Sequence, residues 1–295
     1  MSVWSLVIPV KRLAAAKSRL APLPTARRAD LALAFVHDCV TAALAAPEVA
    51  QVVVATADEA AAASLARLGA RIALEPPGGV PARPGADEGA EAADGAQTRL
   101  NAAIAFAAGL SRRESPQWRV GALTGDLPSL RTRELSAVLH LAVAIDGRSF
   151  VPDAAGSGTT LLLGGRDGVL DPRFGSDSRG RHARSGAAEL FGAGRSLRQD
   201  VDTLADLEAA LRLGVGAHTA HEIGLGLMQG TVRSFDPETR GGTVLLDDGT
   251  ELPYDAAAFD AGGLRLARIG QRVALRADDR GRITALTLAT LPLPD

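Results

Sequence analysis

Short apolar runs alternate with longer amphipathic stretches along the first two thirds of the chain. Val3–Val10, Gln51–Thr56 and Arg71–Leu74 are apolar over lengths typical of buried strands. Between them, Thr25–Leu44 and Asp58–Leu68 carry apolar residues at helical spacing. This order of strand, helix, strand, helix and strand predicts an α/β fold, in which a mostly parallel sheet has helices on both faces.

The alternation continues to residue 213 with one long interruption. It predicts helices at Thr98–Leu110, Thr132–Ala144, Ala183–Phe191 and Leu204–Leu213, strands at Arg119–Leu123, Ser149–Pro152 and within Gly156–Leu163, and a strand that ends at Asp200–Thr203. Lys11–Leu20 is expected to form a loop and a short helix, and Thr25 is a candidate N-cap. The interruption, Pro77–Gln97, has too few apolar residues to fold and predicts a mobile, acidic loop.

From Met228 the pattern changes to short alternating runs, separated by turns that contain Asp, Pro and Gly. These runs predict a small all-β unit, and their spacing is typical of a barrel. Residues 215–226 are rich in Gly, His and Thr and are expected to form a linker. We therefore predict two domains, at residues 1–222 and 228–295.

Composition and charge narrow the class of protein. The net charge of -2 gives no overall attraction to nucleic acid or to an anionic membrane. The single cysteine, Cys39, cannot form an internal disulfide and lies in an apolar helical run, so we expect it to be buried. The sequence shows neither a basic-then-apolar leader nor an apolar run long enough to span a bilayer, which predicts a soluble, cytoplasmic protein.

The only lysines of the chain, Lys11 and Lys17, follow the first predicted strand, and every other basic residue except the histidines is arginine. An ammonium is a compact point charge and a common phosphate ligand, whereas a guanidinium is a planar fork. The pattern favours a specific need for ammonium groups here, although a chance surface pair is the alternative.

Polar residues follow three predicted strands at their carboxyl ends, where open parallel sheets bind ligands. Lys11 and Lys17 follow the first strand, Asp126 follows the Arg119–Leu123 strand, and Asp200 with Asp202 follow the last one. Carboxylates from separate strands that face two lysines predict a site for a polyphosphate bound to Mg²⁺. For Asp202, capping of the next helix is an equal alternative.

Two further clusters favour an anionic substrate. The predicted loop Asp171–His182 and the residues after it are rich in basic side chains, namely Arg173, Arg179, Arg181, His182 and Arg184. Thr159 and Thr160 follow a Gly-Ser-Gly turn, whose N–H groups could hold a phosphate or carboxylate. A solvated basic loop and a plain hairpin turn are the respective alternatives.

Several motifs over residues 1–222 together resemble the CofC/FbiD family, the guanylyltransferases of coenzyme F-420 biosynthesis. They are IPVKRL at 8–13, KSRL at 17–20, GDLP at 125–128, GT at 158–159, PRFGSDS at 172–178, RH at 181–182 and DVDT at 200–203. The resemblance implies a GT-A-like nucleotidyltransferase fold, Mg²⁺ dependence, and transfer of GMP from GTP to a three-carbon phosphorylated acid with release of pyrophosphate. The acid would be phosphoenolpyruvate, 2-phospho-L-lactate or 3-phospho-D-glycerate.

The resemblance also implies roles for individual residues. Thr159, Gly175 and Ser178 would bind the acid, and Asp126 and Asp200 would hold the metal with Asp202 as a supporting residue. Lys17, together with Arg12 or Lys11, would meet the phosphates of GTP and provide the catalytic positive charge. The family suggests either a monomer or a homodimer.

The tail resembles a cold-shock domain, an OB-type barrel that stacks single-stranded nucleic acid on aromatic side chains. The resemblance rests on QGTVRSFDP at 229–237, DDG at 247–249 and IGQRV at 269–273. Ser234 stands where that family has Trp, and RGGTVL at 240–245 replaces its aromatic run. The loss disfavours nucleic-acid binding and favours an oligomerising or stabilising role.

Two other functions stay open at this point. One is an RNA-associated regulator that works through the tail, and the missing aromatics argue against it. The other is a nucleotidyltransferase that acts on a sugar phosphate or a sterol-precursor phosphate. The motifs at Pro172–Ser178 and Thr159 disfavour this second alternative.

Overall fold

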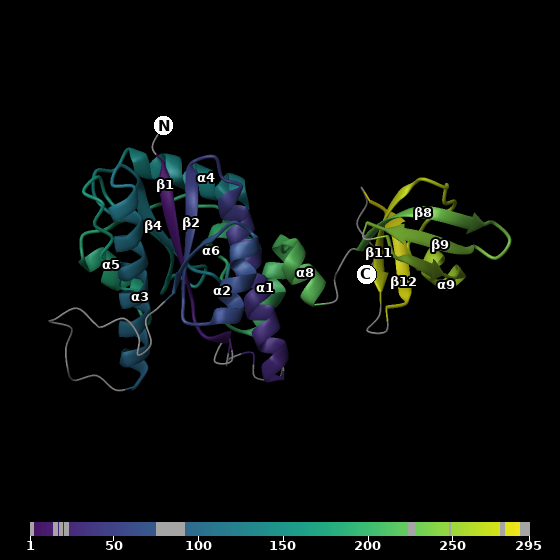
Figure 1. Ribbon diagram of the computed structural model, residues 1–295, viewed down its shortest axis with the longest axis horizontal. Helices are drawn as coiled ribbons and strands as arrows, with labels where there is room; N and C mark the ends of the chain where they lie inside the picture. Colours follow the sequence, from purple (N-terminus) through teal and green to yellow (C-terminus); the bar gives the residue numbers. More distant parts are fainter. Residues whose placement is uncertain are drawn as a thin grey trace. The chain divides into compact units, whose positions relative to one another are not determined.

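The computed structural model describes residues 3–13, 17, 20, 24–74, 92–223, 228–247, 249–277 and 281–289. The chain divides into two compact units, Met1–Gly216 and Ala217–Asp295. Each unit has its own hydrophobic core, and Figure 1 shows an α/β unit and a β-rich unit. Within the described residues, no helix is both long and apolar enough to cross a membrane.

The first unit is built on a seven-stranded sheet with the order β3-β2-β1-β4-β6-β5-β7. Its strands are β1 (Trp4–Val10), β2 (Val49–Thr56), β3 (Arg71–Leu74), β4 (Arg119–Leu123), β5 (Ser149–Pro152), β6 (Thr159–Leu163) and β7 (Ala188–Glu189). All ladders are parallel except the two that β6 makes with β4 and β5. The predicted α/β fold with a mostly parallel sheet is confirmed.

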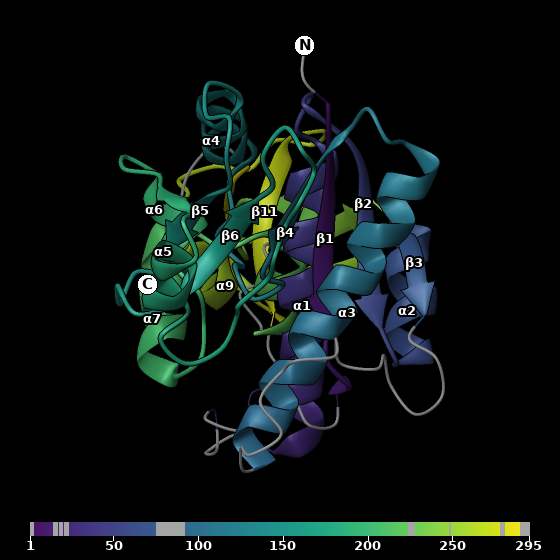
Figure 2. The ribbon, with the colours of Figure 1, turned by 90° about the vertical axis from the view of Figure 1, so that its left-hand side faces the viewer.

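Helices cover both faces of this sheet, because successive side chains of a strand point to opposite sides. In β1, Leu6 and Ile8 join a core with α1 (Thr25–Leu44), whereas Val7 joins a second core with α3 (Ala92–Glu114). The first core also includes α2 (Glu59–Arg67) and α4 (Thr132–Val143). Figure 2 shows α3 in front of the sheet and α1 behind it. Each fully buried aliphatic side chain contributes about 1.5–3 kcal/mol to stability.

Two predicted elements between residues 171 and 203 are wrong. The helix predicted at Ala183–Phe191 lies earlier, as α5 (Ser178–Arg184), and ends where Gly186 adopts a φ of 85°. The chain then adds β7 to the edge of the sheet, beside β5. Asp200–Thr203 does not end a strand, because it follows the short helix α6 (Arg195–Arg198). Local periodicity could not show either feature, since the sheet edge is a tertiary contact.

Helix starts also differ from the prediction. α3 begins at Ala92, so the last part of the predicted loop 77–97 is helical, while residues 75–91 lie outside the described part of the chain. Thr25 is the first residue of α1 rather than its N-cap. Half of the predicted loop and helix at 11–20 is likewise outside the described residues. For α7 (Leu204–Leu213) the cap is Thr203, in a capping box with Asp206, and not Asp202.

The second unit contains a five-stranded antiparallel sheet with the order β10-β9-β8-β11-β12. Its elements are α8 (Ala217–Glu222), which lies in the predicted linker, β8 (Met228–Asp236), β9 (Gly241–Leu246), β10 (Glu251–Tyr254), α9 (Ala256–Ala261), β11 (Arg272–Ala277) and β12 (Ile283–Leu288). In the described residues the sheet is open, because no ladder joins β10 to β12. Gly262, after α9, lies so close to β12 that a Cβ there would meet the Leu286 backbone. The end of α9 therefore lies against β12, which is one of the two edge strands of this sheet.

Candidate active site

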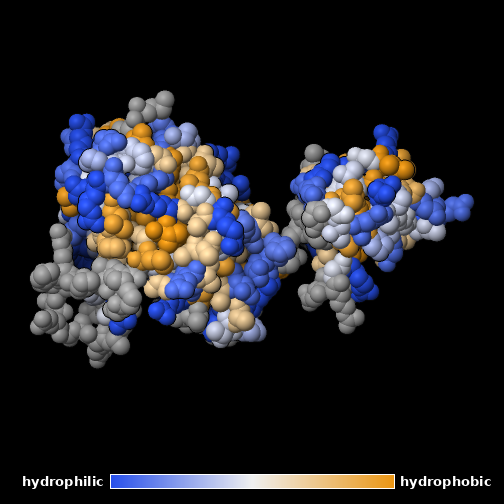
Figure 3. Space-filling model, in the orientation of Figure 1, coloured by the Kyte–Doolittle hydropathy of each residue, from blue (hydrophilic) through white to orange (hydrophobic). Residues whose placement is uncertain are grey.

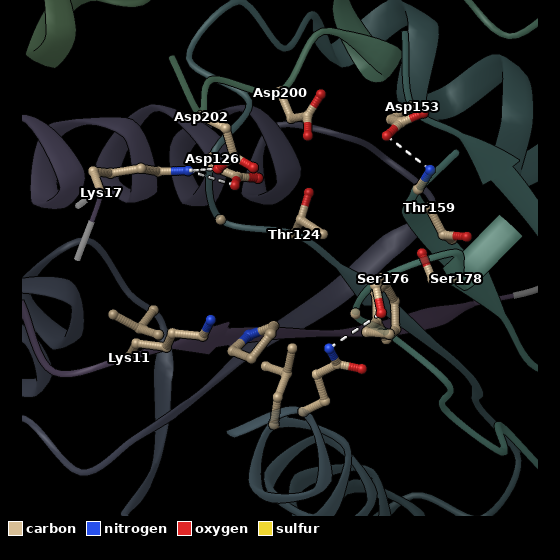
Figure 4. Close-up of a pocket in the computed structure, with 18 of the residues that line it drawn as sticks. Lys11, Lys17, Thr124, Asp126, Asp153, Thr159, Ser176, Ser178, Asp200 and Asp202 are labelled. Carbon is tan, nitrogen blue, oxygen red and sulfur yellow. Dashed lines mark hydrogen bonds and ion pairs between the residues drawn. The ribbon is translucent and has the colours of Figure 1, made fainter. Parts of the chain in front are cut away.

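A cleft of about 600 Å³ opens at the carboxyl edge of the first sheet. This is the edge at which an open α/β sheet binds its ligands. Seven of the eight candidate site residues line the cleft, namely Lys11, Lys17, Asp126, Thr159, Gly175, Ser178 and Asp200. Figure 4 shows acidic side chains gathered near Lys17 and two hydroxyls, from Thr159 and Ser178, facing each other. The cleft thus has an acidic region and a hydroxyl-lined region.

Lys17 holds the acidic region together. Its Nζ donates to Asp126 Oδ2 at 2.7 Å and to Asp202 Oδ1 at 3.0 Å. Burial alone would lower the pKa of this ammonium, but the two carboxylates more than offset burial, so the pKa is raised. The Lys17 backbone is left-handed, with a φ of 53°, which is costly for a residue other than glycine. Lys17 therefore carries a permanent charge in a constrained position.

A backbone hydrogen bond joins the two acidic segments. The N–H of Val201, between Asp200 and Asp202, donates to the carbonyl O of Asp126 at 3.1 Å. On the other side, the buried Sγ of Cys39 contacts the N–H and the C=O of Leu127, at 3.3 and 3.4 Å. The hydrogen bond from Val201 to Asp126 thus places Asp200 at the cleft, and Asp200 does not follow a strand of its own. Cys39 is buried, as predicted.

Negative charge exceeds positive charge in the acidic region. Asp126, Asp153, Asp200 and Asp202 line the cleft with only two lysines, while the remaining acid, Asp177, pairs with Arg184. Burial, followed by the charges of Asp126, Asp153 and Asp202, raises the pKa of Asp200 to about 7. The region can therefore accept further positive charge.

A divalent cation fits this region. Within the described residues, Asp126 Oδ1 and Thr124 Oγ1 are buried without a hydrogen-bond partner, which is rare in folded proteins. The described side chains include no group of three or more His, Cys, Asp and Glu that would already form a metal site. Mg²⁺ does not require one, because it binds one or two carboxylates plus substrate oxygens and waters.

The opposite wall of the cleft consists of Thr159, Gly175 and Ser178. Thr159 opens β6, and Ser178 is the first residue of α5; both are nearly fully buried. Gly175 has a φ of 118°, and a Cβ there would lie 2.4 Å from the side chain of Gln97. This backbone conformation favours glycine, and a larger residue would also require the Gln97 side chain to move.

Asp153 was missed in the sequence, although it follows the predicted strand Ser149–Pro152. Its carboxylate accepts the N–H of Ser157 at 2.9 Å and of Gly158 at 2.8 Å, and it closes the turn before Thr159. A Cβ on Gly158 would lie 2.4 Å from this carboxylate. The rule that singled out the other acidic residues, a polar side chain at the carboxyl end of a strand, would also have found Asp153.

Within the described residues, the arginines and His182 differ from the two lysines, because they do not add free positive charge to the cleft. Arg12 is exposed, does not line the cleft, and adds to the effect of the Leu13 N–H in lowering the pKa of Asp58. The arginines of the predicted basic loop mostly pair with local acids, as Arg173–Asp171, Arg179–Glu189 and Arg184–Asp177. The observed loop therefore contributes little unbalanced positive charge. His182 is fully buried rather than part of an exposed loop.

Comparison with known proteins gives consistent matches over the same length. The chain is 52% identical over 219 residues to the phosphoenolpyruvate guanylyltransferase of Streptomyces scabiei, covering 74% of this chain and 94% of that one. It is 49% identical to the same-named protein of Streptomyces avermitilis, with coverage of 74% and 92%. A putative nucleotide-diphospho-sugar transferase from Desulfovibrio desulfuricans has a TM-score of 0.48 at 16% identity, over 72% of this chain and 87% of that one. No family model matches the chain.

A cleft at the carboxyl edge of an α/β sheet, with excess carboxylates and a buried lysine, is suited to a nucleotidyltransferase. The identity over nearly the whole length of these relatives shows this class: the chain is a nucleotidyltransferase enzyme. It belongs to the phosphoenolpyruvate guanylyltransferase family, which is the CofC/FbiD family that the sequence resembles. About a quarter of the chain lies outside these matches.

Proposed function

We propose that this enzyme transfers GMP from GTP to the phosphate of phosphoenolpyruvate, releasing pyrophosphate, in coenzyme F-420 biosynthesis. The observation that carries the proposal is the identity of 49–52% to curated relatives named for this activity. The cleft supports it, because its acidic region suits a metal–polyphosphate and its hydroxyl-lined region suits a small anion.

Lys17 is the residue that we assign to the phosphates of GTP. Its side chain is only 11% exposed and permanently charged, and a fixed charge that is shielded from water stabilises a transition state more than one in water. Lys11 is the second candidate because it lines the cleft, whereas Arg12 lies outside it, beside Asp58. Lys11 therefore takes precedence over Arg12 in this role.

Asp126 and Asp200 are the residues that we assign to Mg²⁺, with Asp202 and Asp153 near them. The partnerless Oδ1 of Asp126 and the raised pKa of Asp200 both indicate carboxylates that lack a cation. A bound Mg²⁺ would supply positive charge near the phosphorus under attack. The protein's own contribution is to hold the carboxylates together through the Val201 N–H and Lys17.

Thr159, Gly175 and Ser178 are the residues that we assign to the acid. They would fix its carboxylate and phosphate so that a phosphate oxygen attacks the α-phosphorus of GTP in line. The new P–O bond forms as the bond to pyrophosphate breaks, and no covalent enzyme intermediate is needed. Positioning and charge stabilisation then provide the rate enhancement.

Pyrophosphate release by the purified protein tests the proposal, with GTP and Mg²⁺ and with phosphoenolpyruvate, 2-phospho-L-lactate or 3-phospho-D-glycerate in parallel. We expect turnover with phosphoenolpyruvate and GTP but not with CTP or UTP. Release with another of these acids would replace the substrate but keep the reaction. Folded protein that releases no pyrophosphate with any acid would overturn the proposal.

For the second unit we propose an OB-type barrel that stabilises the enzyme or joins two copies into a homodimer, rather than one that binds nucleic acid. Ser234, at the position of the lost Trp, bonds to Thr243 at 2.9 Å. Figure 3 shows hydrophilic and apolar residues intermixed on the visible face of this unit, and two of its strand arginines, Arg233 and Arg272, pair with acids. Deletion of residues 223–295 should leave kcat/KM nearly unchanged, and light scattering would show any loss of a dimer.

We place the enzyme in the cytoplasm. Fractionation of cells that produce the protein would test this placement.

A further inference from the structure

His182 is the buried group that the proposed reaction does not yet use. It lies in the last turn of α5 and is 0% exposed. Both ring nitrogens have partners, since Nε2 lies 3.0 Å from the N–H of Arg173 and Nδ1 lies 3.0 Å from Thr159 Oγ1. The rings of Phe150 and Phe174 lie close to it, with centroids 5.8 and 5.2 Å away. The imidazole is thus fixed in place between two segments that border the cleft.

The partners of His182 determine which nitrogen carries the proton. A backbone N–H can only donate, so Nε2 must accept from Arg173. A neutral imidazole then has its proton on Nδ1 and donates it to Thr159 Oγ1. Burial, and then the charges of Arg181 and Arg148, lower the pKa of His182 to about 4. The ring is therefore neutral at neutral pH, as this arrangement requires.

This tautomer determines what the Thr159 hydroxyl can do. Because Oγ1 already accepts from Nδ1–H, the hydroxyl proton remains available for an acceptor in the cleft that Thr159 lines. An anionic oxygen is a strong acceptor for such a proton. The hydroxyl is thus oriented to bind an anion before any ligand arrives.

The same ring also fixes the loop that carries Gly175. Nε2 holds the N–H of Arg173, and the next N–H, of Phe174, donates to Asn101 Oδ1 of α3 at 2.8 Å. Two consecutive amides are therefore anchored directly before Gly175. One imidazole links Thr159 to the loop that carries Gly175, so the spacing of these two parts of the wall depends on it.

We propose that His182 is a positioning residue for the acid substrate, which makes Thr159 a hydrogen-bond donor to the acid and fixes the Gly175 loop at the matching distance. The inference rests on the proposed function, because it assigns this wall to the acid. It adds that a chain of hydrogen-bond donors, from the Arg173 N–H through His182 to Thr159, leaves the Thr159 hydroxyl proton for an anionic oxygen of the acid.

Steady-state kinetics test the proposal with His182→Phe, which removes both hydrogen bonds, and Thr159→Val, which removes the hydroxyl. Loss of a hydrogen bond to a charged group costs about 10- to 100-fold, so each variant should raise KM for the acid by roughly this factor. KM for GTP should change less than about threefold. Because His182 acts through Thr159, the double variant should be less impaired than the product of the two single effects.

The control is His37→Phe, which removes another histidine–hydroxyl contact, from Nε2 to Ser64 at 2.8 Å, outside the cleft. It should leave both KM values unchanged. Equal rises in KM for GTP and for the acid with His182→Phe, or fully multiplicative effects in the double variant, would overturn the proposal. If the unmodified protein releases no pyrophosphate, the proposed function fails instead, so the two failures are distinct.

A measurement on the unmodified protein covers the case in which the His182 variant does not fold. Long-range ¹H–¹⁵N NMR of the imidazole rings distinguishes the Nδ1–H tautomer from the Nε2–H tautomer and from imidazolium. The signals of His182 are assigned by elimination, with single substitutions of the other four histidines. We expect Nδ1–H at pH 7. An Nε2–H tautomer or a charged ring at this pH would contradict the inference.

Discussion

The two units of this chain treat charge in opposite ways. In the first unit, Asp126, Asp153, Asp200 and Asp202 crowd one cleft with Lys17 as their buried cation. In the second unit, three exposed arginines each lie against one carboxylate, in the pairs Arg233–Glu251, Arg240–Asp260 and Arg272–Asp247. The first arrangement leaves a large charge imbalance, and the second leaves almost none.

The difference shows that the first unit keeps unfavourable repulsion between carboxylates in its folded state. Buried like charges are costly, and they persist only where the surrounding structure holds them. Exposed ion pairs are screened by solvent and contribute little. The unbalanced carboxylates therefore indicate a ligand-binding site, whereas the paired arginines of the second unit describe a solvated surface with no strong attraction for a polyanion.

The largest effect is expected from Asp126→Ala. It removes a carboxylate that contacts Lys17 at 2.7 Å and that has a second, partnerless oxygen. Pyrophosphate release should fall by at least about 10³-fold, because charge stabilisation in a closed site is the main source of catalysis. Asp247→Ala in the second unit is the matched control and should stay within about twofold. Comparable losses in both variants would erase the contrast between the units.

Asp200 should make the stability of the metal-free protein depend on pH. Its pKa of about 7 lies above the ordinary value of 3.8, so the folded state binds its proton more tightly than the unfolded state does. The free energy of unfolding should therefore fall as pH rises from about 4 to about 7, by at most about 4 kcal/mol from this group. Urea unfolding with a chelator present measures the fall.

Two variants of that experiment sharpen it. Asp200→Asn should flatten the decline, and Mg²⁺ should oppose it, because a cation favours the charged carboxylate. If the free energy of unfolding falls with pH equally in Asp200→Asn and in the unmodified protein, Asp200 does not have a raised pKa, and the negative charge of the cleft is already compensated.

Lys17→Arg should have a smaller effect on activity than loss of a carboxylate. The charge remains, but a planar guanidinium does not reproduce a compact ammonium that contacts two carboxylates at 2.7 and 3.0 Å. We expect kcat/KM to fall about 10- to 100-fold, which equals about 1.4–2.8 kcal/mol. Activity measured beside Lys11→Arg, which should lose less because Lys11 is exposed, separates charge from shape. Full activity in Lys17→Arg would show that position 17 requires only a positive charge and not an ammonium group.

The smallest effect is expected in the second unit. Glu251→Gln removes one partner of Arg233, at 3.1 Å, and both side chains are more than two fifths exposed. Such pairs contribute about 0–1 kcal/mol, so the denaturation midpoint should hardly change. A loss well above this range would mean that the charge pairs of the second unit support its fold.

Much of the first unit could be predicted from the sequence, because periodicity reflects burial on one face or two. The strands β3, β4 and β5 and the helix α7 have the predicted bounds, and Lys17 and Asp126 lie at the strand ends that the topology brings together. Asp200 also reaches the cleft, but through the Val201 N–H and not through a strand. The sequence thus predicted correctly that Asp200 lies at the cleft, but the strand that was expected to bring it there is absent.

The features that the sequence did not reveal depend on contacts between distant segments. β7 exists only because β5 offers an edge. The role of His182 depends on an amide and a hydroxyl that come from two other segments, so its neighbours in the sequence suggested only a basic loop. The arginines of that loop were visible, but their local acidic partners could be recognised only in three dimensions.

The contact between Lys17 and Asp202 has a consequence for synthesis of the chain. These residues are 185 positions apart, and at about 5–20 residues per second a ribosome needs roughly 10–40 s to add the second after the first. Even after Asp126 has been added, 109 residues after Lys17, the emerging chain still lacks the segment that completes the cleft. A truncated product that ends before residue 202 would therefore be a protein with an unfinished cleft, and the nascent enzyme stays inactive until almost all of its first unit has been made.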